Sequence, residues 1–598
     1  MSPPDPTTPD QEPSDPTRPD PALVGLVPAV GDRRPTVPEP ADRPASPVRR
    51  ATIVLMAVLV ALLAGLAAPD AWPAGDGTAE LLVDHEVMAT APITLGDPAA
   101  VTTSAGGWTL FLPEGAATRG TVTAVVTRDG AAVAVGEVEL VLVLPDGRRE
   151  PVAGIRTDDD GALHLQRRAA GDIAIVLGVL GMVVVLWVSE VVPLWTTSLV
   201  VPFVLAATDV MGASDVLAPF FHPIIVLFFA GFLMAEAMRR VGLDRLAAVW
   251  LVAALGRSPG MLYASLLGVS AVLSMWMSNT AAVAVLLPIV LAIAEPLGSR
   301  AATRTMVLGV AYAATIGGVG SAIGTPANPI AMEFLSRAAG RDLTFVDWFA
   351  YGLPMVVLFL PLMGFILWRR EGVQIDPERF VQARAVAVGH AHAAGRLSGR
   401  QVTVLVVFLL VVAAWLTEQV HGVSAGIIAL GGAITLSALG LVQTDDLGRI
   451  SWSSLLTFGG GLTLGIALTD SGASDWIATR LAGLDDLPSF VGILAVAVVT
   501  LLATTVASNT ATAATFVPLA IPLAGVLGIS PAVLVPVVAI ASSVDFALVI
   551  GTPPTMLAYS TGLFTVRDIL RAGVIFDLLG IVLLVTVVTW TWGLLGVV

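Results

Sequence analysis

The chain of 598 residues contains no cysteine and no lysine, and only 13% of its residues are charged. The absence of cysteine excludes disulfides and thiolate metal sites. Of the six histidines only His390 and His392 lie close together, in a polar stretch, so no metal-binding cluster is indicated. We recognise no catalytic nucleophile and no loop for nucleotide phosphates, which makes an enzyme the least favoured class. Neither an organic cofactor nor a nucleic-acid partner is expected.

Apolar residues dominate the composition and occur in long runs. They make up 56% of the chain, and the mean hydropathy is +0.85. Several runs reach about 18 residues or more, and about 20 helical residues cross the hydrocarbon core of a bilayer. These properties predict an integral membrane protein in contact with lipid, which we place in the cytoplasmic membrane of a bacterium.

The first 70 residues divide into a polar tail and one apolar segment. Residues 1–48 are rich in proline, aspartate and threonine and lack apolar periodicity, so we expect a disordered tail. Arg49 and Arg50 then precede an apolar run to Ala68. A signal peptide is one interpretation of this run, but the run begins far from the N-terminus and has a poor cleavage context. We therefore predict a first transmembrane helix at 49–70, which leaves the tail cytoplasmic.

Residues 77–168 have an alternating apolar and polar character. Short alternating stretches are separated by turn signals such as Pro145-Asp146-Gly147. This pattern predicts antiparallel strands in a small β-sandwich, which resembles the immunoglobulin-like or transthyretin-like modules of bacterial surface proteins. Because the region follows the first helix, we place it outside the cytoplasmic membrane. A stabilising insert and a module for ligand sensing or partner binding both remain open as its role.

The rest of the chain is organised around a motif that occurs twice. Ser-Asn-Thr stands at 278–280 and again at 508–510, a shift of 508 − 278 = 230 residues. A helix-breaking Gly-Thr-Pro sequence follows each triplet, at 324–326 and at 551–553, a shift of 551 − 324 = 227 residues. The shared order of triplet and breaker predicts an internal repeat.

The repeat divides the membrane part into repeat 1 at 171–370, a cytoplasmic linker at 371–400 and repeat 2 at 401–598. We predict that the linker is a polar loop. Each half has about five predicted spans and one triplet segment, which is either two ordinary spans or a re-entrant hairpin with the triplet at its tip. An odd number of spans inverts the second half relative to the first. The arginines obey the positive-inside rule when the N-terminus is cytoplasmic and the C-terminus extracytoplasmic.

The predicted fold class is therefore an all-α polytopic membrane protein with the β-sandwich inserted. It is an inverted-repeat transporter with about 11 transmembrane helices and two re-entrant hairpins, and the binding site is expected where the repeats meet.

The two motifs together suit the binding of a cation and an anion. A broken helix leaves carbonyl groups, which suit a hard cation, and a free helix N-terminus, which suits an anion. The Asn amide of each triplet offers an oxygen to a cation and an NH₂ group to a carboxylate. Neither motif contains a basic residue, so co-bound cations are needed to hold an anion. Small residues also permit close helix packing, but two copies in register disfavour that interpretation.

These motifs resemble the divalent anion/sodium symporter family, which includes citrate, dicarboxylate and sulfate carriers. The match comprises the paired triplets, the Ser or Thr four residues before each, and the IGTPAN and IGTPPT loops. The resemblance implies a homodimer that works by an elevator mechanism, with sodium as the coupling ion. It implies the sodium ligands Ser274, Ser278, Asn279, Gly324, Thr504, Ser508, Asn509 and Gly551. It also implies the substrate-binding residues Asn279, Thr280, Thr325, Pro326, Asn509, Thr510, Thr552 and Pro553.

Three positions depart from that family's pattern. Ala327 stands where a second proline is common, and Thr555 stands where the family often has asparagine. Asp545 lies at membrane depth beside the second break, and carboxylates inside a membrane are usually functional. We predict that Asp545 is a cation ligand or a proton-coupling group. The alternative is a packing role in which Ser542 and Ser543 satisfy its carboxylate.

The sequence thus predicts a secondary active transporter that imports a di- or tricarboxylate together with sodium. A dicarboxylate exchanger and a sulfate carrier of the same fold are alternatives, because hydroxyl and amide donors accept any small oxyanion. A membrane receptor that uses the β-domain is an alternative of another class.

Overall fold

The structure is a computed structural model that describes most of the chain from residue 47 onward. Before residue 170 it describes one helix and nine strands, and from there to residue 597 it leaves out only 340–342, 482 and 484–486. The predicted tail at 1–48 lies almost entirely outside the described residues. The predicted first helix corresponds to α2 (Pro47–Leu66).

The β-region consists of strands paired in two antiparallel sheets. The strand orders are β2-β1-β6-β7 and β3-β4-β5-β9-β8. The strands are β1 (Gly75–Val83), β2 (Glu86–Leu95), β3 (Val101–Ala105), β4 (Trp108–Leu112), β5 (Val122–Arg128), β6 (Glu139–Val143), β7 (Arg149–Pro151), β8 (Ile155–Thr157) and β9 (Leu163–Arg167). Antiparallel pairing is what the alternating pattern predicts. The packing of the two sheets into one sandwich stays a prediction.

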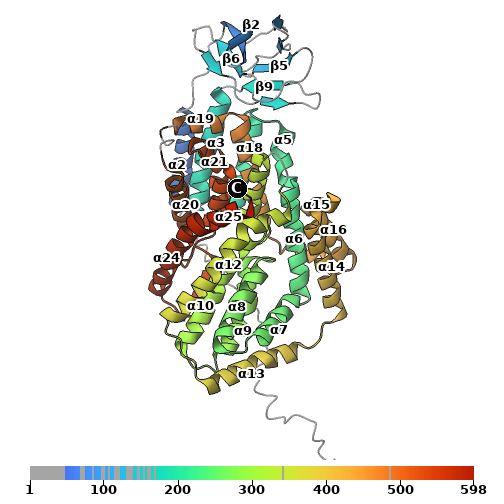
Figure 1. Cartoon of the computed structure of the whole chain (residues 1–598), viewed down its shortest axis with the longest axis vertical. Coiled ribbons are helices and arrows are strands. Elements are labelled where there is room, and N and C mark those ends of the chain that lie inside the picture. The colour runs from blue at the N-terminus through green and yellow to red at the C-terminus, as the bar shows by residue number, and fades with distance from the viewer. Residues whose placement is uncertain are drawn as a thin grey trace, which may run out of the picture. The chain divides into compact units, whose positions relative to one another are not determined.

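The described chain after the strands is helical (Figure 1). In chain order the elements are α3 (Ala170–Ser189), α4 (Leu194–Ala207), α5 (Ala213–Leu217), η1 (Ala218–Phe221), α6 (Pro223–Arg240), α7 (Leu243–Leu255), α8 (Pro259–Ser274), α9 (Asn279–Ala294), α10 (Arg300–Gly317), η2 (Gly318–Gly320), α11 (Ala327–Ala339), α12 (Phe345–Arg370), α13 (Pro377–Ala394), α14 (Gly399–Leu416), α15 (Glu418–His421), α16 (Ala425–Ala438), α17 (Thr444–Leu447), α18 (Trp452–Asp470), α19 (Ala473–Arg480), α20 (Ser489–Val506), α21 (Asn509–Val526), α22 (Pro531–Ala541), α23 (Pro553–Ser560), α24 (Val566–Leu583), η4 (Leu584–Val588) and α25 (Thr589–Leu595).

Many of these helices are suited to a bilayer. Within the described residues, 8 helices are long and apolar enough to cross a membrane, and shorter apolar helices accompany them. Their outer faces carry exposed large apolar side chains such as Phe203, Leu410 and Val506, which water would disfavour and lipid accommodates. The prediction of a multi-pass membrane protein is therefore confirmed, whereas the total of about 11 spans stays a prediction.

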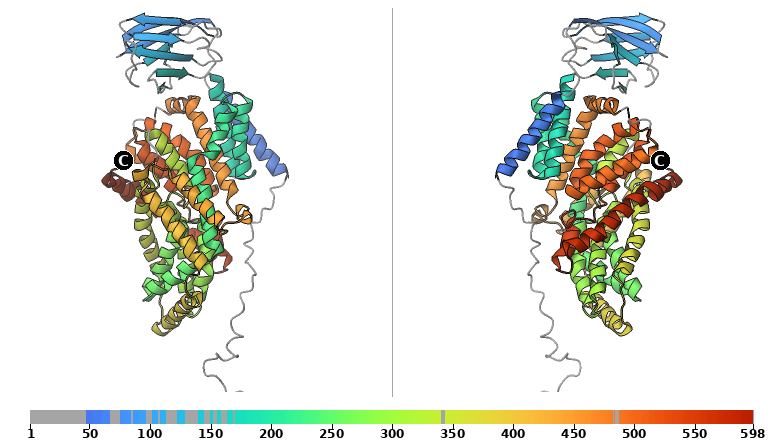
Figure 2. Two further views of the ribbon diagram at one scale, coloured as in Figure 1. Left: turned by 90° about the vertical axis from the view of Figure 1, so that its right-hand side faces the viewer. Right: turned by 90° about the vertical axis from the view of Figure 1, so that its left-hand side faces the viewer.

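The second half of the helical part repeats the helix order of the first. Helices α6, α8 to α11 and α12 are followed in the same sequence by α18, α20 to α23 and the pair α24 and α25. The last two helices continue through the π-helical turn η4 as one long rod, dark red in Figure 2. The common order agrees with an internal repeat, and the inverted orientation of the halves stays a prediction.

Each triplet lies at the junction of two helices and includes the first residues of the second helix, and each Gly-Thr-Pro sequence lies at a helix break. The first triplet separates α8 from α9 and the second separates α20 from α21. Whether each pair of helices re-enters or spans stays a prediction. The first break, between η2 and α11, is braced by the Asn328 amide, which donates to the carbonyl oxygens of Gly318 at 2.9 Å and Ser321 at 2.6 Å. These bonds satisfy carbonyls that the broken helix leaves free.

The segment at 371–400, which the sequence predicts to be a polar loop, contains a helix. Asp376 caps α13 by accepting from the Glu378 N–H at 2.8 Å. Phe380, Ala383 and Ala387 form its buried face, which packs against α7 and α9 (Figure 1). Only three apolar residues make this face, so the polar majority concealed the helical period in the sequence.

A charged cluster joins the end of α6 to the segment before α18. Asp446 is fully buried, accepts from the Gln443 N–H at 2.7 Å and pairs with Arg240 at 2.6 Å. Burial opposes ionisation of Asp446, but the Gln443 N–H and the guanidinium of Arg240 outweigh it and hold the pKa of Asp446 below its usual range. The ion pair therefore stabilises the fold above the unfolded-state pKa of about 4 and loses that contribution as the pH falls through the lower folded-state pKa.

We expect Asp446→Asn to destabilise the protein by about 2 kcal/mol at neutral pH, because it leaves a half-buried Arg240 without its partner. Thermal unfolding in detergent measures the change, with the exposed neighbour substituted in Asp445→Asn as the matched control. The difference between the two variants should shrink below about pH 4. Equal melting temperatures at neutral pH would contradict the assignment.

Candidate substrate and cation site

A polar cavity of about 380 Å³ lies where both triplets and both helix breaks meet. Its wall contains the triplets at 278–280 and 508–510 and the breaks at 323–326 and 551–554. All the residues predicted to bind substrate line this cavity, namely Asn279, Thr280, Thr325, Pro326, Asn509, Thr510, Thr552 and Pro553. Motifs that are far apart in the sequence thus share one wall, and their individual roles stay predictions.

The predicted sodium ligands lie in two places relative to the cavity. Ser274 and Thr504 are fully buried behind its wall. The others line the cavity: Ser278, Asn279, Gly324, Ser508, Asn509 and Gly551.

The first triplet forms a compact cluster of oxygen atoms. The Ser274 hydroxyl lies 2.5 Å from Oδ1 of Asn279 and 2.6 Å from the Ala314 carbonyl oxygen, and it can donate its proton to one of them at a time. A Cβ atom built on Gly318 would lie 2.5 Å from Asn279 Oδ1 and 3.0 Å from the Gly324 carbonyl oxygen. Neutral oxygens from a side-chain amide, a hydroxyl and an unwound backbone are the ligands that coordinate sodium in transporters with broken helices.

The second triplet reproduces this arrangement. The Thr504 hydroxyl lies 2.9 Å from Oδ1 of Asn509 and 2.6 Å from the Ser542 carbonyl oxygen. In both repeats a buried hydroxyl therefore orients the amide oxygen of the triplet and contacts the carbonyl of a helix that ends at the break. The amide NH₂ of each asparagine is left for another partner.

The serine of each triplet caps the helix that follows it. The Ser278 hydroxyl accepts from the Ala281 N–H at 3.3 Å, and the Ser508 hydroxyl accepts from the Ala511 N–H at 3.2 Å. The caps begin α9 and α21 at the cavity wall, so the positive ends of both helix dipoles face the cavity. Helix N-termini of this kind favour an anion.

The cavity carries no formal charge of its own. Among the described residues that line it, none is basic and none is acidic. The described wall therefore offers an anion hydroxyls, amides and helix ends, but no positively charged side chain. This agrees with the prediction that cations and anion bind together.

Asp545 lies next to the cavity wall and is fully buried. A Cβ atom on Gly551 would overlap both of its carboxylate oxygens, and neither oxygen has a hydrogen-bond partner within the described part of the chain. The expectation that Ser542 and Ser543 satisfy the carboxylate is wrong, because Ser542 donates instead to the Ala539 carbonyl at 2.8 Å and the Ser543 hydroxyl has no partner among the described residues.

Several residues near the site were not predicted from the sequence. Phe228 and Phe232 of α6 line the cavity, as do Ser451 and Ser454 at the start of α18. The two serines are hydrogen-bonded to each other at 2.7 Å. The sequence feature that could have indicated these two serines is a polar pair at the start of an apolar helix.

The second triplet also contacts a residue from the first helices of the transporter part. Glu190 accepts from the Ser508 N–H at 3.1 Å and has a left-handed backbone with φ 48°. Non-glycine residues rarely adopt that conformation, so the surrounding structure imposes it.

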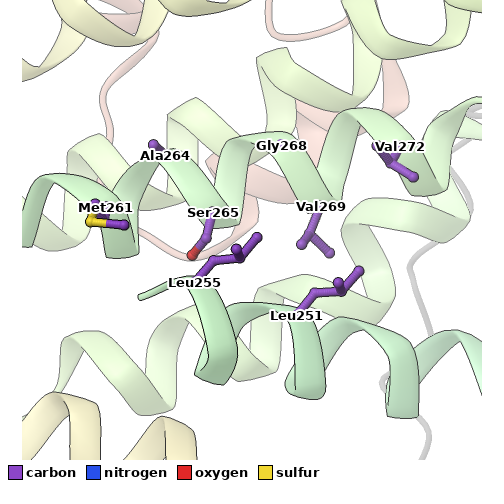
Figure 3. Close-up of a pocket in the computed structure, with 8 residues that line it drawn as sticks. All are labelled: Leu251, Leu255, Met261, Ala264, Ser265, Gly268, Val269 and Val272. Carbon is purple, nitrogen blue, oxygen red and sulfur yellow. The ribbon is translucent and has the colours of Figure 1, made fainter. Parts of the chain in front are cut away.

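A second depression, of about 420 Å³, lies between α7 and α8. Figure 3 shows its apolar lining, which includes Leu251, Leu255 and Met261. The only polar side chain among the described residues that line it, Ser265, already donates to the Leu262 carbonyl at 2.8 Å. This depression offers an anion no free donor and suits an apolar chain such as that of a lipid.

Broken helices and paired polar turns around one cavity, within a set of membrane-crossing helices, define a membrane transporter rather than an enzyme. The family model described as "Citrate transporter" matches residues 184–535, and the chain belongs to this family. The predicted resemblance to the divalent anion/sodium symporters is thereby confirmed.

Several proteins are similar to this chain in sequence over most of its transporter part. An uncharacterized transporter of Haemophilus influenzae is 31% identical over 436 residues, which cover 70% of this chain and 91% of that protein. The sodium-dependent dicarboxylate transporter SdcS of Staphylococcus saprophyticus is 29% identical over 433 residues, which cover 67% and 83%. Among solved structures, the MtrF efflux pump of Neisseria gonorrhoeae aligns with a TM-score of 0.49 and 11% identity over 90% of this chain and 94% of its own.

Proposed function

We propose that this protein is a secondary active transporter that imports di- or tricarboxylates together with sodium. The observation that carries the proposal is the single cavity shared by both triplets and both helix breaks, which has helix N-termini for an anion and oxygen clusters for cations. Relatives named sodium-dependent dicarboxylate transporters support both the coupling ion and the substrate class.

In this proposal each oxygen cluster binds one sodium ion. The first comprises Ser274, Ser278, Asn279 and the Gly324 carbonyl, and the second comprises Thr504, Ser508, Asn509 and the Gly551 carbonyl. The substrate carboxylates then receive hydrogen bonds from the two asparagine amides, Thr280, Thr510 and the turns at 325–326 and 552–553. Because no basic side chain lines the described cavity, the sodium ions supply the positive charge that the anion requires.

We further propose that the protein is a homodimer in the bacterial cytoplasmic membrane and works by an elevator mechanism. The two triplet segments are re-entrant hairpins of inverted repeats at 171–370 and 401–598, which hold the site and move together. The exposed apolar residues of α14 and α16, such as Leu410 and Ile434, fit contact with lipid or with a second copy of the chain. The β-domain and the C-terminus are extracytoplasmic, and the N-terminus is cytoplasmic.

The orientation can be tested without removing any native thiol, because the chain contains no cysteine. Ala394→Cys in the linker is expected to react with a membrane-impermeant maleimide only after the cells are opened. Val420→Cys, between α14 and α16, is expected to react in intact cells. Both side chains are exposed in the structure, so accessibility to water does not distinguish them. The opposite labelling pattern would overturn the proposed orientation.

The function is tested by uptake of radiolabelled succinate into proteoliposomes that contain the purified protein. The expected result is uptake with an inward sodium gradient and none when potassium replaces sodium. Uptake that ignores sodium but is accelerated by internal succinate would identify an exchanger instead. Competition by unlabelled citrate and sulfate ranks the substrates. Absence of transport for all three anions, with binding retained, would favour a receptor.

A further inference from the structure

The Asp545 carboxylate lacks a hydrogen-bond partner among the described residues, in a segment whose backbone is held in place. The next residue, Phe546, donates its N–H to Asp577 at 2.8 Å and accepts from the Tyr312 hydroxyl at 3.0 Å. Both bonds fix the backbone beside Asp545. The carboxylate itself is fully buried, and both oxygens lack a hydrogen-bond partner among the residues that the structure describes.

The repeat shows where a side chain at this position points. Asp545 precedes Gly551 by 551 − 545 = 6 residues, and Gly318 precedes Gly324 by the same 324 − 318 = 6 residues. A Cβ atom on Gly324 would overlap the backbone of Gly318, whereas a Cβ atom on Gly551 would overlap the side-chain carboxylate of Asp545. In both repeats the residue six positions before the glycine therefore lies against it. In the first repeat a Cβ atom on Gly318 would enter the oxygen cluster formed by Asn279 and Gly324. The carboxylate of Asp545 thus lies against Gly551, a member of the second oxygen cluster, on the residue whose counterpart Gly318 borders the first cluster.

A buried carboxylate without a partner either takes up a proton or needs a positive charge against it. No ion pair involves Asp545 within the described residues, and the neighbouring cavity wall contains no basic side chain there. A cation from solution in the second oxygen cluster would supply the missing charge. A carboxylate oxygen is also a stronger ligand for a hard cation than the neutral oxygens of the first cluster.

We propose that Asp545 is a direct, charged ligand of the second cation and makes the two cation sites unequal. The second site then binds sodium before any substrate is present. The first site, which has only neutral ligands, fills when the anion arrives. This ordered binding rests on the proposed function, because it assigns the two oxygen clusters to sodium. Its novel element is the fixed negative charge in one of them.

The test measures binding of radioactive sodium to the purified protein in detergent without any carboxylate substrate. Asp545→Asn keeps the shape of the side chain and removes its charge, and Asp545→Gly restores the glycine of the first repeat. We expect both to weaken sodium binding by at least about tenfold, the lower end of what the loss of an outer-shell partner costs a metal site. The matched control is Asp244→Asn, which neutralises a buried carboxylate in α7 that does not line the cavity and should retain sodium binding.

A second readout separates a cation ligand from a merely structural residue. If Asp545 is a cation ligand, sodium bound to the native protein stabilises the folded state, and Asp545→Asn loses most of this stabilisation. Added sodium should then stabilise the native protein more than the variant. Unchanged sodium binding in Asp545→Asn, or an equal rise in melting temperature with added sodium in the variant and the native protein, would overturn the inference.

The two proposals fail in different ways. If the native protein shows no sodium-dependent uptake of any anion, the proposed function fails. If it shows such uptake while Asp545→Asn binds sodium as the native protein does, the transporter stands and the charged site does not.

Discussion

Asn279→Ala and Asn509→Ala are each expected to lower sodium-dependent succinate uptake by about 100-fold, the upper end of the loss in affinity that a metal site suffers when a supporting group is removed. Each amide oxygen lies in an oxygen cluster, 2.5 Å from the Ser274 hydroxyl or 2.9 Å from the Thr504 hydroxyl. Alanine removes the oxygen and leaves the buried hydroxyl with one partner fewer. It also removes an NH₂ donor from the cavity wall.

Initial uptake rates in proteoliposomes, at several sodium concentrations, measure this effect. Thr505→Ala is the matched control, because Thr505 adjoins Thr504 but its hydroxyl donates to its own helix, to the Leu501 carbonyl at 2.7 Å. The control should transport like the native protein. If either asparagine variant kept native uptake with native sodium dependence, its triplet would have no part in the site.

Gly318→Ala is expected to abolish sodium-dependent uptake while the protein still folds. The added methyl group would lie 2.5 Å from Asn279 Oδ1, closer than atoms of these types approach, and 3.0 Å from the Gly324 carbonyl oxygen. The backbone from Gly318 to Ser321 is braced by Asn328 and cannot easily retreat. The amide oxygen must therefore leave the position in which it is proposed to ligate sodium.

Uptake and thermal unfolding are measured together for this variant. The matched control is Gly268→Ala in α8, where an added Cβ atom has open space. Alanine there favours the helix by up to about 1 kcal/mol, so the control should be at least as stable as the native protein and should transport normally. Native uptake by Gly318→Ala would show that the first oxygen cluster does not bind the coupling ion.

The candidate site was predictable from the sequence because its residues form short, recognisable motifs, and each motif occurs in both repeats. Ser-Asn-Thr and Gly-Thr-Pro are helix caps and helix breakers, and such residues are polar or conformationally special inside otherwise apolar runs. The repeat in register then linked motifs that no local pattern connects. The cavity wall contains the predicted substrate residues for this reason.

Other parts of the neighbourhood had no comparable signal. Phe228 and Phe232 look like any apolar helix residues in a membrane protein, and only the packing of α6 beside the triplets makes them part of the wall. The contact of Glu190 with Ser508 spans 318 residues of sequence and depends on a strained backbone position. The helix α13 was hidden because a short apolar face among polar residues resembles a loop.

The sequence by itself determined the membrane class, the order of triplets and breaks, and the family, since these depend on composition, on runs of apolar residues and on short motifs. The tertiary structure decided which polar atoms meet. Among the described residues it left the Asp545 carboxylate, which lies against Gly551, without a hydrogen-bond partner, although two serines stand within three residues of it in the sequence. Neighbours in sequence need not face one another at a helix break, because the backbone changes direction there and burial and hydrogen bonding are settled by elements from other parts of the chain.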